Sequence, residues 1–418
     1  MINPHEIAVG KPIERKSRIL WANTYCLLDT SSGASLSIRE MLRELAFHGY
    51  EIAIVGATVF DSPKGIVKIK EHWYDLQKKL GQVAIINDDP LSHFLFVTKS
   101  TYRDDMTSKE ETLWHSLYSQ ILDTFKPDLI FYYGGQAIDY LVGVEAKHRG
   151  IPVAAYLVNG NFSGKRWCRD VDLIITDSRA TAEFYLKKES YNITPVGTFI
   201  HKMRVVAPQH TRERLLFINP SLEKGAGIVI QLAQLLQERS SDIQFEVVES
   251  RGNWHKLVKE VTYSLGNPKE TLSNVIVTQH TDDMRPIYSR ARLLLAPSLC
   301  WESGARVLAE AMLNGIPAMI TDHGGSLEMV QNAGICLKLP FECHEKPFTK
   351  LPKMETLEPL VDTLIRIYND QSYYIDMVSK AYKIGQMLHS LSANTQRLID
   401  AFEPLLRICA GDQQVSEY

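Results

Sequence analysis

Short apolar segments rich in β-branched residues alternate with segments of helical periodicity along most of the chain. In the first half, the apolar segments predict strands at residues 18–22, 51–55, 83–86, 94–97, 129–133, 153–157 and 173–176. Periodic segments predict a helix over 36–48, which Gly49 ends, and another from the capping-box sequence 107–110 to about Phe125. Strands that alternate with helices are typical of βαβ units, and hence of a parallel sheet in the α/β class.

This pattern breaks over residues 197–212, a polar stretch that contains Pro208, and a second alternation then begins. It predicts strands at 215–218, 245–248, 275–277, 293–296 and 319–321, helices at 228–238, 284–290 and 306–314, and a helical region from 356 to about 409. Two alternations separated by a linker near residue 205 predict two Rossmann-like domains, an N-terminal one over 1–205 and a C-terminal one over 213–390.

Composition and charge argue against several classes of protein. The 418 residues are 45% hydrophobic and 23% charged, close to the average of globular proteins. Because 46 Lys and Arg nearly balance 49 Asp and Glu, the basic excess that is usual in duplex-binding proteins is absent, and the sequence carries no strong nucleic-acid signal. The six cysteines include no C-x-x-C pair, so we expect neither a disulfide framework nor a structural zinc site.

The pattern of apolar residues also shows no segment typical of a signal peptide or of a membrane span. Residues 1–16 contain no apolar core of the kind a signal peptide needs, and no stretch approaches the ~18 consecutive apolar residues of a membrane span. We therefore expect a cytoplasmic protein. The basic residues Lys165, Arg166 and Arg169 near Trp167 fit either peripheral contact with a membrane or an acidic ligand, or a solvated loop.

The strongest candidate for chemistry is the stretch 297–330, which reads PSLCWESGARVLAEAMLNGIPAMITDHGGSLEMV. It begins where a predicted strand ends and a helix starts, the edge at which ligands bind in open α/β sheets. Small residues at 303–305 let backbone N–H groups approach a ligand, and a helix N-terminus favours an anion such as a diphosphate. Glu302 and Glu310 lie about 12 Å apart if both are on one helix, so they either hold two ends of a hydroxyl-bearing ligand or are solvated helical residues.

Two further loops follow predicted strands and precede helices. In the sequence FINPSLEKG at 217–225, Lys224 either places an ammonium near a phosphate at the helix start or is an ordinary surface lysine. In DTSSGA at 29–34, Gly33 permits close backbone approach, and the hydroxyl groups can cap the helix. This loop has no G-x-G-x-x-G and the chain has no G-x-x-x-x-G-K-[ST], which argues against a dinucleotide dehydrogenase and a P-loop NTPase.

Together these stretches resemble glycosyltransferase family 4, a family of retaining GT-B enzymes. The resemblance is specific over residues 213–336 and looser over the first 200. The residues that carry it are Pro297, Ser298, Glu302, Glu310, Ala311, Gly315, Pro317, Gly324, Gly325 and Glu328, together with Lys224, Gly225 and Gly33. It implies the GT-B fold, in which two Rossmann-like domains face each other across a cleft and a C-terminal helix, here about 393–409, crosses back onto the first domain.

The resemblance also implies roles for single residues. The C-terminal domain would hold a nucleotide-diphosphate sugar as donor, with Glu302 on hydroxyls of the transferred sugar, Glu310 on the ribose and Lys224 on the diphosphate. The N-terminal domain would hold the acceptor. Further donor contacts are expected from Ser303, Gly304, Ala305, Arg306, Asn219, Glu249, Arg251 and Gly325, and acceptor or phosphate contacts from Ser32, Gly33 and Asn159.

Three positions depart from the family pattern. Asn219 stands beside Pro220 where many members carry Gly-Arg, and Arg306 or Arg251 is a candidate to replace that arginine at the diphosphate. Asn159 lies in the region where a histidine is common. Arg306 itself occupies a place where a small residue is frequent, and is either a donor contact or a solvated helical residue.

The predicted function is a retaining, hexosyl-type glycosyltransferase that acts on an acceptor hydroxyl. No D-x-D sequence lies in a convincing loop position for Mg²⁺, so no metal and no cofactor are expected, and Lys224 with nearby N–H groups would stabilise the leaving diphosphate. Front-face attack, with the leaving phosphate taking the acceptor proton, follows from the resemblance. The alternatives are a nonenzymatic relative that binds a nucleotide sugar or a partner, and another GT-B enzyme such as an epimerase. The sugar, the nucleotide and the acceptor stay open.

Overall fold

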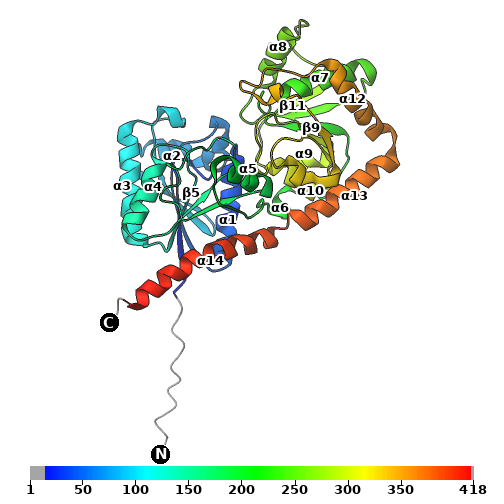
Figure 1. Cartoon of the computed structure of the whole chain (residues 1–418). Coiled ribbons are helices and arrows are strands. Elements are labelled where there is room, and N and C mark those ends of the chain that lie inside the picture. The colour runs from blue at the N-terminus through cyan, green and yellow to red at the C-terminus, as the bar shows by residue number, and fades with distance from the viewer. Residues whose placement is uncertain (1–14, 416–418) are drawn as a thin grey trace, which may run out of the picture.

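The computed structural model describes residues 15–415, with side chains for residues 15–407. Residues 1–14, which hold most of the stretch used to argue against a signal peptide, lie outside the described residues. Two α/β domains lie side by side, and the long C-terminal helices run along both of them (Figure 1). No helix among the described residues is both long enough and apolar enough to cross a bilayer.

The N-terminal domain has an eight-stranded sheet of order β3-β4-β2-β1-β5-β6-β7-β8, parallel except for the antiparallel pair β3 and β4. Its strands are β1 (Arg18–Ala22), β2 (Glu51–Ala57), β3 (Val83–Asp88), β4 (Leu91–Phe96), β5 (Leu129–Tyr132), β6 (Val153–Tyr156), β7 (Leu173–Thr176) and β8 (Ile193–Pro195). Its helices are α1 (Gly33–Phe47), α2 (Trp73–Gln77), α3 (Ser108–Phe125), α4 (Asp139–His148) and α5 (Arg179–Glu189), with 3₁₀ turns η1 (Pro63–His72) and η2 (Arg103–Asp105).

The C-terminal domain has a fully parallel six-stranded sheet of order β11-β10-β9-β12-β13-β14. Its strands are β9 (Arg214–Ile218), β10 (Phe245–Val248), β11 (Val275–Thr278), β12 (Ala291–Ala296), β13 (Ala318–Thr321) and β14 (Gly334–Leu337). The remaining helices of the chain are α6 (Lys202–Val205), α7 (Ala226–Arg239), α8 (Trp254–Ser264), α9 (Arg285–Arg290), α10 (Arg306–Leu313), α11 (Ser326–Val330), α12 (Met354–Asn369), α13 (Gln371–Leu388) and α14 (Leu391–Val415), with 3₁₀ turns η3 (Gln331–Ala333) and η4 (Phe341–His344).

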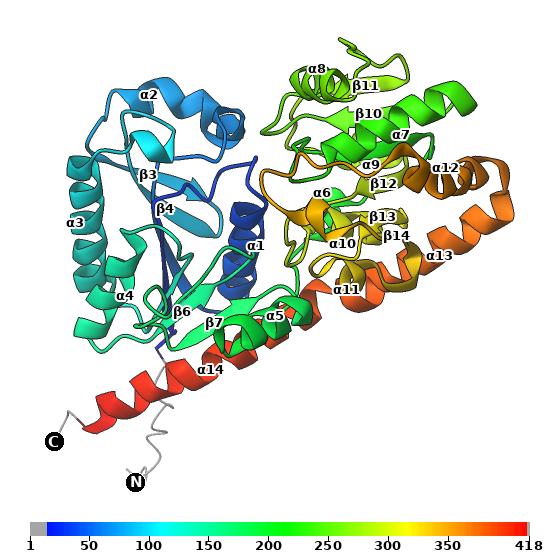
Figure 2. The ribbon, with the colours of Figure 1, turned by 45° about the horizontal axis from the view of Figure 1, so that its top comes forward.

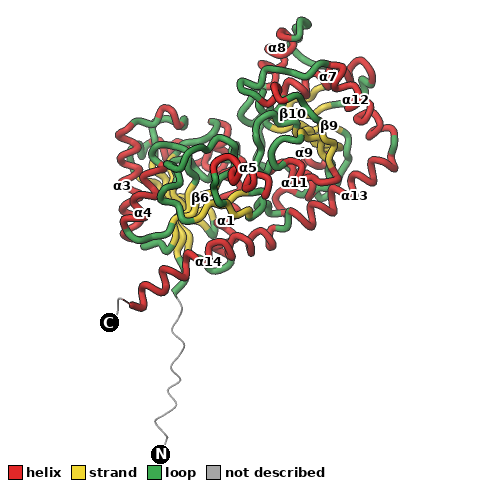
Figure 3. Tube along the Cα trace, viewed as in Figure 1, coloured by secondary structure: helices red, strands yellow, loops and turns green. Residues whose placement is uncertain are grey.

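Both sheets are covered by helices on their two faces, which explains why the strands read as nearly continuous apolar segments (Figure 3). Strand β9 shows the arrangement, because successive side chains of a strand point to opposite faces. Leu215 and Phe217 pack into the cluster that contains α7, whereas Leu216 packs into the cluster that contains α10. The strands end at the edge of each sheet that carries the predicted site loops.

The segment between the two sheets differs from the polar linker that the sequence predicts. It contains the short helix α6, and Phe199, Ile200 and Val205 are buried against the two domains. Helix α14 then continues from α13 along the N-terminal domain (Figure 2). Leu398 and Phe402 of α14 pack into the same cluster as β1, and the ring of Phe402 lies 5.4 Å from that of Phe131.

One predicted boundary was wrong and one segment was not predicted, each for an identifiable reason. Helix α1 begins at Gly33 rather than at residue 36, because the Ser32 hydroxyl accepts the N–H of Ser35 and caps the helix before its first apolar residue. The region 63–77, to which the sequence assigned no element, forms η1 and α2 and buries Ile69 and Leu76. A 3₁₀ segment has three residues per turn, so its apolar residues do not show the α-helical period.

Candidate functional site

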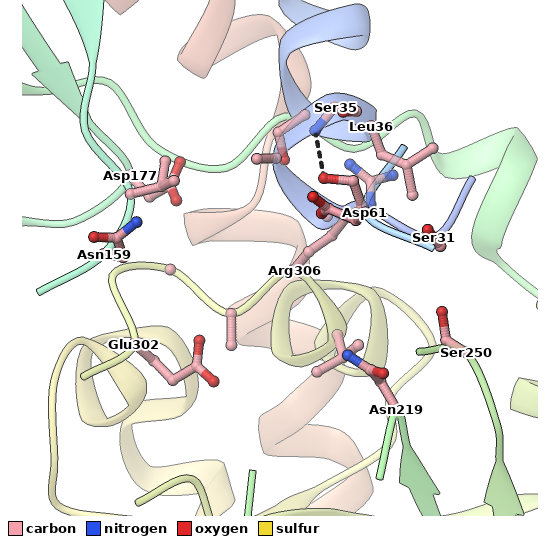
Figure 4. A pocket seen from close by; sticks show the side chains of 18 of the residues that line it. Ser31, Ser35, Leu36, Asp61, Asn159, Asp177, Asn219, Ser250, Glu302 and Arg306 are labelled. Atoms are coloured by element: carbon pink, nitrogen blue, oxygen red, sulfur yellow. Dashed lines mark hydrogen bonds between the residues drawn. The ribbon is translucent and has the colours of Figure 1, made fainter. Parts of the chain in front are cut away.

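A cavity of about 1320 Å³ lies between the two domains, at the carboxyl ends of both parallel sheets. Most of the predicted site residues line it, and Figure 4 shows Asn159 and Asp177 of the N-terminal domain across from Glu302 of the C-terminal domain. The predicted residues that line it are Ser32, Gly33, Asn159, Asn219, Lys224, Arg251, Glu302, Gly304, Ala305, Arg306 and Glu310. Glu249, Ser303 and Gly325 do not line it and instead support the loops that do.

Lys224 and Glu302 form an ion pair on the C-terminal wall of the cavity. The Ser298 hydroxyl donates to the same carboxylate oxygen over 2.8 Å. Burial opposes the charge of Lys224, but the Glu302 carboxylate outweighs it and raises the pKa of the ammonium above its usual value. The site therefore holds one fixed positive and one fixed negative group in contact, although they come from different strand-to-helix loops.

Glycine fixes the loop that carries Lys224. Gly225 adopts a φ of +81°, which side chains other than glycine rarely tolerate. A Cβ at this position would also overlap the carbonyl oxygen of Pro297, at the start of the Glu302 loop. The Lys224 loop and the Glu302 loop are thus packed backbone to backbone, and this close approach sets the distance between the two charges.

A second glycine pair supports Glu302 from the other side. The N–H of Gly325 donates to the Glu302 carbonyl over 2.7 Å. A Cβ on Gly324 would overlap the same carbonyl, and a Cβ on Gly325 would overlap the carbonyl of Ser303. The N–H of Gly325 is therefore committed to the protein, and its role is to hold the Glu302 loop in place.

The same loop contacts the N-terminal domain directly. Glu302 and Asn159 form an antiparallel β-bridge, and the Ser303 hydroxyl lies 3.0 Å from that of Thr176 at the end of β7. Gly304 packs so closely on Asp177 that a Cβ would overlap the Asp177 side chain. These contacts, made by backbone and small side chains, close the two domains on each other beside the ion pair.

Glu328 adds a further contact between the domains. Its carboxylate accepts the N–H groups of Arg179 and Ala180 over 3.2 and 3.0 Å, at the N-terminus of α5. A carboxylate in this place satisfies free helical N–H groups and interacts favourably with the helix dipole. A residue on α11 of one domain therefore caps a helix of the other.

Asp177 is a lining residue that sequence reasoning missed. It follows β7, and one of its oxygens accepts a hydrogen bond from the buried Tyr156 hydroxyl. Burial raises the pKa of its carboxyl group to about 7, against the opposing effects of Tyr156 and the Arg306 guanidinium. No motif surrounds Asp177 in the sequence, and its burial depends on Gly304 of the other domain.

Glu310 and Arg306 form a buried pair at the start of α10. Glu302 lies before this helix and Glu310 within it, so the 12 Å helical spacing expected between the two glutamates does not apply. Arg306 Nε lies 2.7 Å from Glu310 Oε1, and the Tyr288 hydroxyl donates to the other oxygen. Arg306 Nη1 also donates to the Phe199 carbonyl over 2.8 Å. Arg306 is thus not a solvated residue, because it ties α10 to the segment between the domains.

The loops after β9 and β10 hold the other predicted donor contacts. Asn219, with a φ of +57°, accepts the N–H of Arg251 through its side-chain oxygen over 3.0 Å. The Arg251 side chain is 40% exposed and lies 3.7 Å from Asp61 of the N-terminal domain. Glu249 accepts the N–H of Trp254 over 2.8 Å at the start of α8, so it positions this loop from behind.

The N-terminal wall is more open around Gly33. A Cβ at Gly33 would meet nothing within 4 Å, so packing does not require glycine there. The Asn159 side chain donates to the Tyr133 hydroxyl over 2.8 Å, and the Asn159 carbonyl accepts from Tyr185 over 2.6 Å. No group of three or more His, Cys, Asp or Glu residues suited to holding a metal ion occurs within residues 15–407.

Comparison with known proteins agrees with this arrangement. Residues 212–342 match the family model described as glycosyl transferases group 1, which coincides with the region of specific resemblance. No curated protein matches the chain in sequence.

Solved structures match nearly the whole chain. A glycosyltransferase from Rickettsia africae ESF-5 has a TM-score of 0.65 at 13% identity, covering 94% of this chain and 99% of that one. Sucrose-phosphate synthase from Thermosynechococcus elongatus has a TM-score of 0.66 at 13% identity, covering 94% and 100%. HepE from Anabaena, in complex with UDP and glucose, has a TM-score of 0.65 at 14% identity, covering 93% and 100%. The predicted GT-B fold is confirmed, and the match to the glycosyl transferases group 1 model lies in the C-terminal domain.

Proposed function

We propose that this protein is a retaining glycosyltransferase that moves a sugar from a nucleotide-diphosphate sugar to an acceptor hydroxyl without a metal ion. The observation that carries the proposal is the Lys224–Glu302 pair on the wall of the cavity between the domains, within the region that matches the group 1 family. Two structurally similar proteins support a UDP-sugar donor. HepE is in complex with UDP and glucose, and a pneumococcal O-GlcNAc transferase, GtfA, is in complex with UDP and GlcNAc.

The donor lies along the C-terminal wall in this proposal. Lys224 neutralises the diphosphate, and Glu302 accepts hydrogen bonds from hydroxyls of the transferred sugar. Glu310 accepts from the ribose, through carboxylate lone pairs that Arg306 and Tyr288 leave free. Arg251, which is partly exposed beside Asn219, is the better candidate for the missing family arginine, because Arg306 is held by Glu310 and the Phe199 carbonyl.

The charge that develops in the reaction falls on the leaving diphosphate. An ammonium already in place at Lys224 and the backbone N–H groups of Gly304 and Ala305 stabilise that charge without reorganisation. The acceptor oxygen bonds to the anomeric carbon while the bond to the diphosphate breaks, and the acceptor proton leaves on the phosphate. The contacts of Asn159 with Glu302 and of Thr176 with Ser303 close the domains and keep water out.

The test is turnover of a panel of UDP-, GDP- and ADP-sugars, followed by nucleotide release and by NMR of the anomeric proton in the product. We expect one donor to be preferred, its anomeric configuration to be kept, and activity to survive EDTA. Inversion would overturn the retaining part, and loss of activity in EDTA that Mg²⁺ restores would overturn metal independence. Lack of turnover and of nucleoside diphosphate binding across the whole panel would overturn the glycosyltransferase itself.

A further inference from the structure

His323 lines the same cavity and has no role in the proposal above. It lies two residues after the end of β13 and precedes Gly324, whose backbone is in contact with that of Glu302. Among the described residues, neither ring nitrogen of His323 has a hydrogen-bond partner. An imidazole that is partly buried beside a sugar-binding carboxylate, with both polar atoms free, has hydrogen-bonding capacity available to a ligand.

The His323 ring is held between two other rings. Trp301 meets it edge to face at 5.3 Å between centroids, and His344 stacks on it at 4.3 Å. Trp301 is itself fixed by the N-terminal domain, because it stacks on Phe184 at 4.0 Å and donates its indole N–H to Thr181 over 3.1 Å. The orientation of His323 is therefore set by aromatic packing and leaves its nitrogen atoms free.

His344 has a defined tautomer. Its Nδ1 lies 2.9 Å from the Leu299 carbonyl oxygen, and because a carbonyl can only accept, Nδ1 must carry the hydrogen. This bond fixes the His344 ring on the loop before Glu302, so the stack of His344 on His323 is anchored to the part of the chain that also positions the ion pair.

The charges around His323 favour its neutral form. Burial and the neighbouring His344 lower its pKa below the usual 6.5, whereas Asp322 on its own turn and Glu302 on the facing loop act in the opposite direction. Glu302 is paired with Lys224, which weakens its effect. At neutral pH, His323 therefore presents one ring nitrogen with a lone pair and the other with a hydrogen.

We propose that His323 binds the attacking hydroxyl group of the acceptor through its free ring nitrogen, with Trp301 and His344 holding the ring in place. The acceptor group is an uncharged O–H group. It belongs to a sugar hydroxyl or, when the donor is hydrolysed, to a water molecule. The hydroxyl passes its proton to the neutral imidazole while its oxygen bonds to the anomeric carbon and the bond to the diphosphate breaks. The imidazolium then gives that proton to the leaving phosphate. This inference rests on the proposed glycosyltransferase function.

The experiment uses water as the acceptor, so no acceptor needs to be known. Hydrolysis of the preferred UDP-sugar is measured from pH 5 to 8 for the full chain and for His323→Phe, which keeps the aromatic packing and removes both nitrogen atoms. We expect hydrolysis to fall about tenfold, as for loss of one hydrogen bond in a dry site, with UDP binding by calorimetry unchanged. His255→Phe on the exposed face of α8, outside the cavity, is the matched control and should leave both quantities unchanged.

The pH profile separates this role from a structural one. Hydrolysis by the wild type should decline at acidic pH as His323 becomes protonated, because a protonated imidazole cannot accept a hydrogen bond. His323→Gln should lose this decline, and His344→Phe should move it to higher pH, since His344 lowers the pKa of His323. Full activity of His323→Phe with an unchanged profile would overturn the proposal, as would loss of UDP binding in that variant. Absence of wild-type turnover with every donor would instead count against the glycosyltransferase function.

Discussion

The two walls of the cavity are built in different ways. On the C-terminal wall, loops meet backbone to backbone at Gly225, Gly324 and Gly325, and the charges of Lys224 and Glu302 are paired. On the N-terminal wall, the loop at Gly33 has open space around it, and the acidic group Asp177 is buried with a pKa near 7. The C-terminal wall is thus shaped in advance for a ligand of fixed charge, whereas the N-terminal wall is less constrained. This difference fits a shared donor and a variable acceptor.

The largest effect is expected from removal of Glu302 on the C-terminal wall. Glu302→Ala takes away the carboxylate that would hold the transferred sugar, and we expect turnover to fall about 100-fold or more, because misplacement of the reacting groups alone has an effect of that size. Asn159→Ala, on the facing wall, is the matched variant and should lose less. Wild-type kcat in folded Glu302→Ala would remove Glu302 from the site.

Lys224→Ala tests the charge of the same wall. A charge-assisted hydrogen bond to a diphosphate contributes about 1.5–3 kcal/mol, so calorimetry should show nucleoside diphosphate binding weaker by that amount. Lys224→Arg should restore only part of it, since a planar guanidinium does not replace a compact ammonium. If Lys224→Ala binds the nucleotide as the wild type does, Arg251 becomes the main candidate.

A pair of glycine variants compares the rigidity of the two walls. Gly225→Ala forces a side chain into a left-handed conformation against the Pro297 carbonyl, and we expect it to lower the free energy of unfolding by about 2 kcal/mol. Gly33→Ala meets no neighbour at the first position of α1 and should change stability by less than about 0.5 kcal/mol. Urea denaturation of both variants measures the difference, and equal losses would contradict the contrast between the walls.

The last prediction concerns the acidic group of the N-terminal wall and how stability depends on pH. Because the folded pKa of Asp177 is raised to about 7, its contribution to stability is fully present below its unfolded pKa near 4 and is lost as pH rises through 7. Asp177→Asn should therefore gain stability relative to the wild type between pH 4 and 7, by at most about 1.4 kcal/mol per pH unit. Thermal unfolding of both proteins across this range is the measurement, and a constant difference would show that Asp177 is ionised throughout.

The C-terminal wall could be predicted from the sequence because its determinants are local. Strand, loop, small residues and helix follow one another within 297–330, so Glu302 and the glycine pair that supports it lie in one stretch. Lys224 was found in the same way, in a loop between a strand and a helix. The direct contact between Lys224 and Glu302 was not predicted, because it depends on how two separate loops pack at Gly225.

The residues that sequence reasoning missed depend on contacts between distant parts of the chain. Asp177 becomes a buried acid only because Gly304 of the other domain covers it, and His323 becomes an oriented ring only through Trp301 and His344. A single aspartate or histidine beside a strand gives no periodic or motif signal. The sequence does not decide between the two roles of Arg306 for the same reason, since its partner, the Phe199 carbonyl, lies in the segment between the domains.

The cap that Glu328 provides to helix α5 has a consequence for how the two domains separate. Separation of the domains would deprive two backbone N–H groups of their carboxylate acceptor and would also break the β-bridge of Asn159. Each opening is therefore an activated event that solvent must complete by hydrating those groups. Glu328 therefore helps to hold the two domains together from a position outside the cavity, at a distance from every residue of the proposed chemistry.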